Sequence, residues 1–403
     1  MKNLLIDTTT EINEFKEKYG LISLYNHKKV LNAFKECNIT TEAFTGSTGY
    51  GYDDYGRKRL NCLYANIFKG EDALVSSNFA SGTHTIYTVF RALLDYGDNI
   101  VSLTGALYDT LEKSLHDEDG LIRKLNITFD KVNLTKSGKI DLDIINNEKF
   151  GKYKMVIIQR SRGYSTRRSI TIEEIEEVAK VIKSKYPNII IFVDNCYGEF
   201  VEMKEPLEVG ADIIAGSLIK NPGGTIAISG GYVVGKKPLI EKVSNAFTVP
   251  GIGKEIGCES STDLRLMFQG VFLAPKIVEE CLISMCYATL LFAKLGFEIS
   301  PMINEKRTDI IQSITFNDKK KLIKFIQTIQ ENSPIDSLAI PLPWEMPGYD
   351  CQVIMASGSF ISGSSLELSA DAPIREPYIA YLQGTTSFYY SKIAIDKAIA
   401  SIL

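Results

Sequence analysis

The sequence predicts an α/β protein with a doubly wound, mostly parallel sheet followed by a smaller α+β domain. Between residues 71 and 236, short runs of consecutive apolar residues alternate along the chain with helical segments. Such uninterrupted apolar runs are typical of strands buried on both faces. Further along the chain, β-rich segments surround one predicted helix at 319–331. We therefore expect three parts: an N-terminal helical segment (1–45), a large domain (46–290) and a small domain (291–403).

Composition argues against several classes of protein. A net charge of -4 gives no electrostatic attraction to nucleic acid or to an anionic membrane. The first residues lack the apolar stretch of a signal peptide and no run reaches the length of a membrane span, so we expect a cytoplasmic protein. The 7 cysteines lack paired spacing, which predicts reduced thiols in place of a disulfide framework or a zinc site. The 3 histidines are dispersed, so no metal is expected.

The predicted elements follow one another in chain order. Apolar residues at helical spacing within residues 8–45 indicate one or two amphipathic helices. Thr171 and Glu174 form a capping box that opens a helix. A mostly apolar stretch from 263 to 295 predicts helix, which Pro275 breaks or restarts. The predicted strands are 73–77, 99–103, 127–132, 154–158, 189–193, 211–215 and 225–235, the last with a glycine bulge or turn in it.

The stretch from residue 188 to 224 contains the residues with the clearest chemistry. Asp194 ends a buried strand and so lies at the carboxyl edge of the sheet, where open α/β proteins bind ligands. The next strand delivers Ser217 and Lys220 to the same edge. A lysine kept from water loses its proton readily and forms an imine with an aldehyde, although most lysines are solvated surface charges. Pyridoxal phosphate needs such a lysine and an acid for its ring nitrogen, which predicts this cofactor.

Small and hydroxyl residues at a strand-to-helix turn suggest a phosphate site. Ser81, Gly82 and Thr83 precede a predicted helix, where free backbone N–H groups can cradle a phosphate. An ordinary structural helix cap is the alternative interpretation. Tyr108 follows the next strand and can lie flat on a planar ring or cover the core.

Two glycine-rich segments leave their interpretation open. The first ends with Tyr55 and Arg57 and is either a solvated loop or an arm whose arginine meets an anion. The second, 251–258, is either a plain connector or a loop that closes over substrate. Neither pattern decides between its alternatives.

Taken in order, these features resemble fold type I of the pyridoxal phosphate enzymes, the aspartate aminotransferase superfamily. Tyr55-x-Arg57 resembles a motif of the cystathionine and methionine gamma-lyases. Segments 159–164, 193–202 and 216–224 are similar to a bacterial methionine gamma-lyase-like family known as aluminum resistance proteins. The resemblance implies a large domain with a mostly parallel seven-stranded sheet and an α+β small domain.

The resemblance also implies roles for individual residues. Lys220 would hold the cofactor as an internal aldimine, with Asp194 on the pyridinium nitrogen. Tyr55 and Arg57 would reach the phosphate of the neighbouring subunit, which implies a homodimer or homotetramer with shared active sites. The residues expected to contact the phosphate, the ring or its hydroxyl within one subunit are Ser81, Gly82, Thr83, Tyr108, Gln159, Asp194 and Ser217.

Arg375 of the small domain is expected to bind the carboxylate of an amino-acid substrate through its planar fork, with an exposed ion pair to Glu376 as the alternative. The predicted activity is a carbon–sulfur lyase that acts by β- or γ-elimination on cystathionine, cysteine or methionine. Lys220, with a pKa lowered by its setting, would move the proton, and Tyr55 or Tyr108 would assist. Two alternatives remain, an aminotransferase and a non-catalytic stress-related protein that retains the fold.

Overall fold

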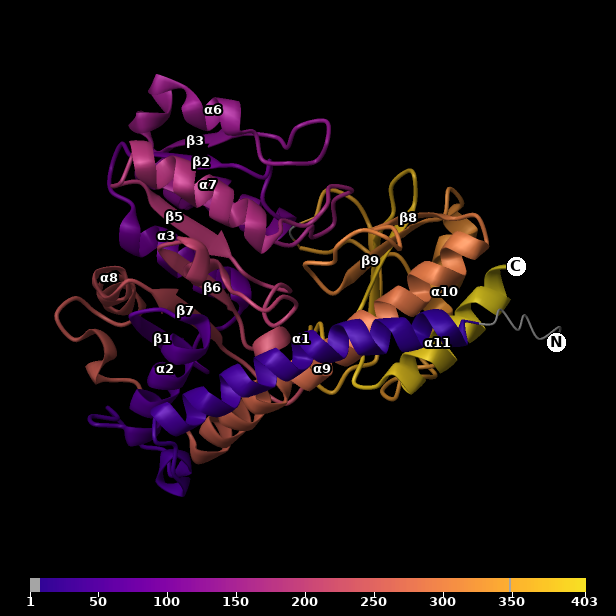
Figure 1. Ribbon diagram of the computed structural model, residues 1–403, viewed down its shortest axis with the longest axis horizontal. Coiled ribbons are helices and arrows are strands. Elements are labelled where there is room, and N and C mark those ends of the chain that lie inside the picture. The colour runs from indigo at the N-terminus through magenta and orange to yellow at the C-terminus, as the bar shows by residue number, and fades with distance from the viewer. Residues whose placement is uncertain (1–7, 348) are drawn as a thin grey trace.

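The computed structural model describes residues 8–347 and 349–403, in which two sheets lie side by side and two long helices run along both (Figure 1). The larger sheet has seven strands in the order β1-β7-β6-β5-β4-β2-β3. The strands are β1 (Asp72–Ser76), β2 (Asn99–Ser102), β3 (Thr128–Lys131), β4 (Met155–Gln159), β5 (Ile190–Asp194), β6 (Ile213–Ser217) and β7 (Gly231–Gly235). The predicted mostly parallel sheet is confirmed, because only β7 runs antiparallel to its two neighbours.

Helices cover both faces of this sheet, since alternate strand residues point to opposite sides. Ile157 and Phe192 pack in a core with α3 and α8, whereas Ile191 and Val193 pack in a second core with α2 and α7. The helices are α1 (Thr9–Glu36), α2 (Tyr55–Phe68), α3 (Gly82–Leu93), α4 (Asp109–His116), α5 (Leu121–Lys124), α6 (Leu142–Asn146), α7 (Ile172–Lys185), α8 (Lys237–Phe247), α9 (Ser261–Lys294), α10 (Lys319–Glu331) and α11 (Phe388–Ile402).

Two expectations about these elements are wrong. Residues 225–229 form no part of a strand, because Thr225 has a left-handed φ of 71° and the N–H groups of Ile226 and Ala227 bond back to Gly223. Pro275 does not break the helix that contains it: α9 runs unbroken from Ser261 to Lys294. Pro275 is buried there, and α1 packs along α9, so tertiary packing offsets the missing backbone hydrogen bond.

The smaller sheet is antiparallel throughout, in the order β10-β11-β12-β9-β8, with α10 and α11 packed against each other beside it. This agrees with the predicted α+β small domain, whose helix α10 has the predicted bounds. The domain boundaries themselves stay predictions. The strands are β8 (Glu298–Ser300), β9 (Ile311–Thr315), β10 (Val353–Ser357), β11 (Ser369–Pro373) and β12 (Ile379–Gln383).

The expectation that all cysteines are reduced is wrong for one pair. Cys37, directly after α1, and Cys62 in α2 form a disulfide, and the other five cysteines are free. Packing of α1 against α2 brings the two sulfurs together from 25 residues apart, a contact that no local spacing reveals. Among the described helices none is long and apolar enough to cross a membrane. Within the same residues, no group of three or more histidine, cysteine or acidic side chains could hold a metal ion.

Candidate active site at the carboxyl edge of the large sheet

Adjacent parallel strands place Asp194 and Lys220 at one edge of the sheet. Asp194 is the last residue of β5 and pairs in register with Ala215 of β6. Ser217 ends β6, and Lys220 follows three residues later, just before a single 3-10 turn at Asn221–Gly223. The residues with the clearest chemistry in the sequence therefore share one rim of the fold.

Lys220 is half-buried and is held by both domains. Its Nζ donates a hydrogen bond to the carbonyl of Gly363 at 3.0 Å and lies 4.9 Å from the centre of the Tyr197 ring. Burial by itself lowers the pKa of Lys220, but Tyr197, Cys196 and Asp371 outweigh it and raise that pKa above its ordinary value. The lowered pKa expected for this lysine is therefore wrong, because acidic neighbours stabilise its charged form.

Asp194 is buried and nearly without solvent contact. Its Oδ1 accepts a hydrogen bond from the backbone N–H of Cys196 at 3.1 Å. Burial raises the pKa of Asp194 to about 6, while that N–H group and the charges of Arg167 and Lys220 oppose the rise. The carboxyl group is thus poised to share a proton with a basic group placed against it.

The start of α3 and the end of β6 meet beside these two residues. Ser81 caps α3, its hydroxyl oxygen accepting a hydrogen bond from the N–H of His84 at 3.1 Å. The first N–H groups of the helix, at Gly82 and Thr83, have no partners within the helix. A Cβ on Gly82 would lie only 3.1 Å from the Cβ of Ser217. Glycine thus keeps open a small cradle of N–H and hydroxyl donors that suits an anion.

Tyr108 is fixed at both of its ends. Its backbone N–H donates to Oε1 of Gln159 at 2.8 Å, and its hydroxyl donates to the hydroxyl of Thr83 at 3.1 Å. Gln159 is the register partner of Asp194 on β4, so the ring of Tyr108 belongs to the same group of residues. Burial raises the pKa of Tyr108 well above its ordinary value, and the nearby Asp194 adds to the rise, so the hydroxyl keeps its proton at neutral pH.

The structure places further residues near Lys220 that were not predicted from the sequence. Tyr197, next to the amine of Lys220, has a left-handed φ of 69°, which is strained for a bulky side chain. Tyr164 donates a hydrogen bond to Oδ2 of Asp371 at 2.7 Å, and the charge of Lys220 opposes the rise that burial gives the pKa of Asp371. An aromatic residue three positions after Asp194 was the available signal for Tyr197, whereas nothing in the chain marked Asp371.

Arg375 is exposed at the edge of this region. It lines a cavity of about 250 Å³ together with Tyr164 and Tyr381. Burial raises the pKa of the nearby Asp109, and the charge of Arg375 opposes that rise only in part. Within the described parts of the chain, Arg375 forms no ion pair with Glu376, so the structural alternative considered for it is not observed. Arg375 therefore keeps its guanidinium available beside the site.

Tyr55 and Arg57 do not join these residues within one chain. Arg57 is buried at the start of α2 and donates to the carbonyls of Glu255, at 3.2 Å, and Gly257. The ring of Tyr55 packs against the guanidinium of Arg59, 4.8 Å from the ring centre. In the single chain, Arg57 thus orders the glycine-spaced loop 251–258 and is not part of the cradle formed by Gly82 and Ser217.

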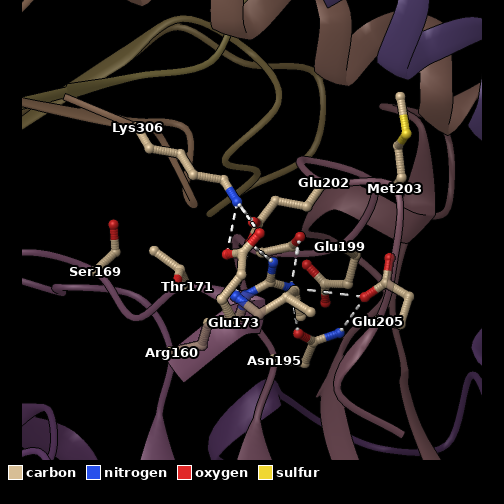
Figure 2. Close-up of polar contacts among 12 residues, drawn as sticks. Arg160, Ser169, Thr171, Glu173, Asn195, Glu199, Glu202, Met203, Glu205 and Lys306 are labelled. Atoms are coloured by element: carbon tan, nitrogen blue, oxygen red, sulfur yellow. Dashed lines mark hydrogen bonds and ion pairs between the residues drawn. The ribbon is translucent and has the colours of Figure 1, made fainter. Parts of the chain in front are cut away.

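An ionic network is centred on Arg160, next to Gln159 of the site, and includes Lys306 and Glu173 (Figure 2). Arg160 follows Gln159 and is completely buried, with hydrogen bonds to Asn195 and Glu202, both at 2.8 Å. Glu202 also pairs with Lys306, which in turn contacts Glu173 at 2.7 Å. These contacts join the segments that follow β4 and β5. Lys306 lies between β8 and β9, so it links both segments to the smaller sheet.

Comparisons with known proteins agree on a family. A family model described as methionine gamma-lyase matches residues 1–403. The uncharacterized protein YnbB of Bacillus subtilis is 45% identical over 407 residues, covering 100% of this chain and 96% of that protein. A carbon–sulfur lyase involved in aluminum resistance from Clostridium novyi NT has a TM-score of 0.93 at 46% identity, covering 98% of this chain and 94% of the other. These similarities extend over essentially the whole chain.

A more distant similarity identifies the fold. Cystathionine gamma-lyase from Lactobacillus plantarum superposes with a TM-score of 0.60 at 18% identity, covering 86% of each chain. At that identity the likeness concerns architecture alone. Together with the sheet order and the antiparallel small domain, it assigns this structure to fold type I of the pyridoxal phosphate enzymes.

Proposed function

The chain belongs to the methionine gamma-lyase family, and from that premise we propose that it is a pyridoxal-phosphate-dependent carbon–sulfur lyase acting on sulfur-containing amino acids. One observation supports this above the others. Lys220, Asp194 and the cradle between Gly82 and Ser217 come from separate segments and meet at a single rim of the large sheet. An imine-forming amine, an acid and an anion site are the three groups that this cofactor requires.

The residues present fit pyridoxal phosphate. A Cβ at Gly82 would enter the cradle, which therefore has room for a phosphate only because a glycine is there. Ser217 and the start of α3 would hold the phosphate, and Asp194 would face the ring nitrogen. Tyr108, fixed by Gln159 and Thr83, would lie against the ring. When bound, the cofactor supplies an electron sink for the carbanion formed as the substrate loses its α-proton.

Lys220 is the proposed proton carrier. Its neutral amine would accept the α-proton of the substrate, and the neighbours that raise its pKa, Tyr197, Cys196 and Asp371, would favour that transfer. Its Nζ then passes the proton to the departing sulfur, so that a thiol leaves. The hydrogen bond to Gly363 and the ring of Tyr197 keep the amine at one position at this rim. Arg375 is proposed to bind the substrate carboxylate from the cavity that it lines.

The test is a product analysis of the purified protein with added cofactor. Cystathionine, cysteine and methionine are supplied separately, while pyruvate, 2-ketobutyrate and thiol are measured. We expect thiol release with pyruvate from β-elimination or with 2-ketobutyrate from γ-elimination. Transfer of the amino group to an added keto acid, without thiol release, would instead identify an aminotransferase. Protein that stays colourless with added cofactor would point to the non-catalytic alternative, and the comparisons favour neither.

We also propose that the working form contains at least two subunits. Arg57 and Tyr55 lie apart from the cradle of their own chain and are expected to reach the phosphate of a neighbour. An apolar surface supports association: Leu21, Leu24 and Leu31 of α1 are exposed although they are large and apolar. Such side chains favour burial against another copy of the chain.

A further inference from the structure

The disulfide between Cys37 and Cys62 lies beside a surface cavity that has no part in the function proposed above. Cys62 is half-buried and lines this cavity of about 460 Å³ together with Asn66 and Lys69, whereas Cys37 is fully buried. The side-chain amide of Asn66 donates a hydrogen bond to Sγ of Cys37 at 3.2 Å. A small molecule in the cavity therefore reaches one sulfur of the pair and not the other.

This asymmetry gives thiol–disulfide exchange a direction. A thiolate in the cavity forms a bond to Sγ of Cys62, the bond between the two protein sulfurs breaks, and Cys37 leaves as a thiolate. The hydrogen bond from Asn66 stabilises that leaving group. A second thiol then displaces the first from Cys62. Two protein thiols and one small-molecule disulfide result, and the protons that the two attacking thiols give up pass to the protein sulfurs.

The disulfide closes a loop that contains the segment proposed to reach the neighbouring subunit. Its cysteines are 25 residues apart, and both Tyr55 and Arg57 lie between them. The packing of α1 along α9 keeps the Cys37 end in place whether or not the disulfide is present. Closing a loop of this length restricts its conformations, so an open disulfide lets the segment between the cysteines leave its position more easily.

Residues 46–57, the glycine-rich part of this loop, are also held by backbone hydrogen bonds to a neighbouring segment. The N–H of Ser47 donates to the carbonyl of Glu259 at 3.0 Å, and the N–H of Gly257 donates to that of Tyr50 at 2.9 Å. The side chains of Tyr50 and Tyr52 are 73% and 62% exposed, so neither ring anchors the segment in the core. Sparse packing of this kind is typical of segments that open locally.

We propose that Cys37 and Cys62 form a redox switch, opened by a low-molecular-weight thiol at the cavity, that controls how firmly residues 46–57 are held for the neighbouring active site. This inference rests on the proposed function, because it concerns the residues expected to reach the phosphate of the partner. The oxidised protein holds Arg57 in place for that phosphate. The reduced protein binds the cofactor more weakly, and a small-molecule disulfide reverses the change.

The first experiment tests which sulfur reacts. Cys37→Ser and Cys62→Ser each leave one thiol of the pair, and both variants are treated with 2-hydroxyethyl disulfide. Mass spectrometry should show the mixed disulfide forming on Cys62 at least about tenfold faster than on Cys37. Cys351→Ser, at a half-buried free cysteine just before β10, is the control and should leave the response of the disulfide to dithiothreitol unchanged. Equal rates at the two sulfurs would refute access through the cavity.

The second experiment follows the segment and the cofactor in cofactor-free native protein, before and after treatment with dithiothreitol and its removal. Chymotrypsin should cleave after Tyr50 or Tyr52 about tenfold faster in the reduced protein. The dissociation constant of pyridoxal phosphate should rise about fivefold or more. Cys37→Ser/Cys62→Ser should match the reduced protein, and reoxidation should restore the original values in native protein alone.

An unchanged cleavage rate or an unchanged affinity for the cofactor would overturn the inference. Failure of the proposed lyase function has a different signature. Native protein would then release no thiol from any substrate, while cleavage after Tyr50 or Tyr52 would still respond to dithiothreitol.

Discussion

At the scale of single residues, the fold changes the proton affinity of two charged groups in the same direction. Acidic and aromatic neighbours raise the pKa of Lys220, and burial raises the pKa of Asp194 to about 6. Both groups therefore hold protons more tightly than they would in water. A basic group placed between them, such as the ring nitrogen of the cofactor, would take a share of the proton of Asp194.

Replacing the lysine should remove both attachment of the cofactor and proton transfer. We expect Lys220→Ala to lower lyase turnover by at least about a thousandfold and to leave the protein colourless or trapped with substrate. The absorbance of bound cofactor and the rate of thiol release measure the two effects. Lys204→Ala, at an exposed lysine of the same domain, is the control and should leave both unchanged. Retained turnover in Lys220→Ala would refute the assignment.

Burial of Asp194 makes the stability of the cofactor-free protein depend on pH. Its pKa of about 6 lies above the unfolded value, so between roughly pH 4 and pH 6 the unfolded chain loses its proton first and stability falls as the pH rises. Asp194→Asn should therefore stabilise the cofactor-free protein at pH 8 by up to about 3 kcal/mol and have little effect at pH 4. Urea unfolding at both pH values tests this. A variant that is less stable than native protein at pH 8 would contradict it.

At the scale of elements, the cradle depends on how closely the start of α3 approaches the end of β6. Gly82→Ala should weaken cofactor binding by about tenfold or more, because its new Cβ would lie 3.1 Å from Ser217 and occupy space needed by the phosphate. Gly20→Ala is the matched control, since a Cβ at that position of α1 meets no atom within 4 Å. Titration of each cofactor-free variant with pyridoxal phosphate gives the two affinities. Equal affinities would mean that the phosphate lies elsewhere.

Local patterns predicted most elements because each depends on neighbours in the chain. The capping box of Thr171 and Glu174 opens α7 in the structure as predicted, since its hydrogen bonds span only three residues. The prediction that Pro275 breaks its helix was wrong because the outcome depends on residues far away in the chain. A proline breaks an isolated helix, but the packing of α1 along α9 stabilises the continuous helix from a distant part of the chain.

At the scale of the whole molecule, the proposed sharing of sites between subunits can be tested by complementation. Arg57→Ala and Lys220→Ala subunits should each form inactive assemblies. Refolded together in equal amounts, they should regain roughly a quarter of native activity, because about half of the dimers are mixed and each mixed dimer has one site with both native residues. Turnover of the mixture against each variant alone measures this. No recovery would place Arg57 in the site of its own chain, or outside any site.

The sequence by itself determined most strands of the large sheet, the acid and lysine at one edge of that sheet, and the glycine and hydroxyl groups before α3. Each follows from the period of apolar residues or from the end of a buried strand, which are local properties. Only the tertiary structure decided the raised pKa of Lys220, the disulfide of Cys37, and the place of Asp371 beside the site. These depend on contacts between segments far apart in the chain, and no local pattern encodes which segments will meet.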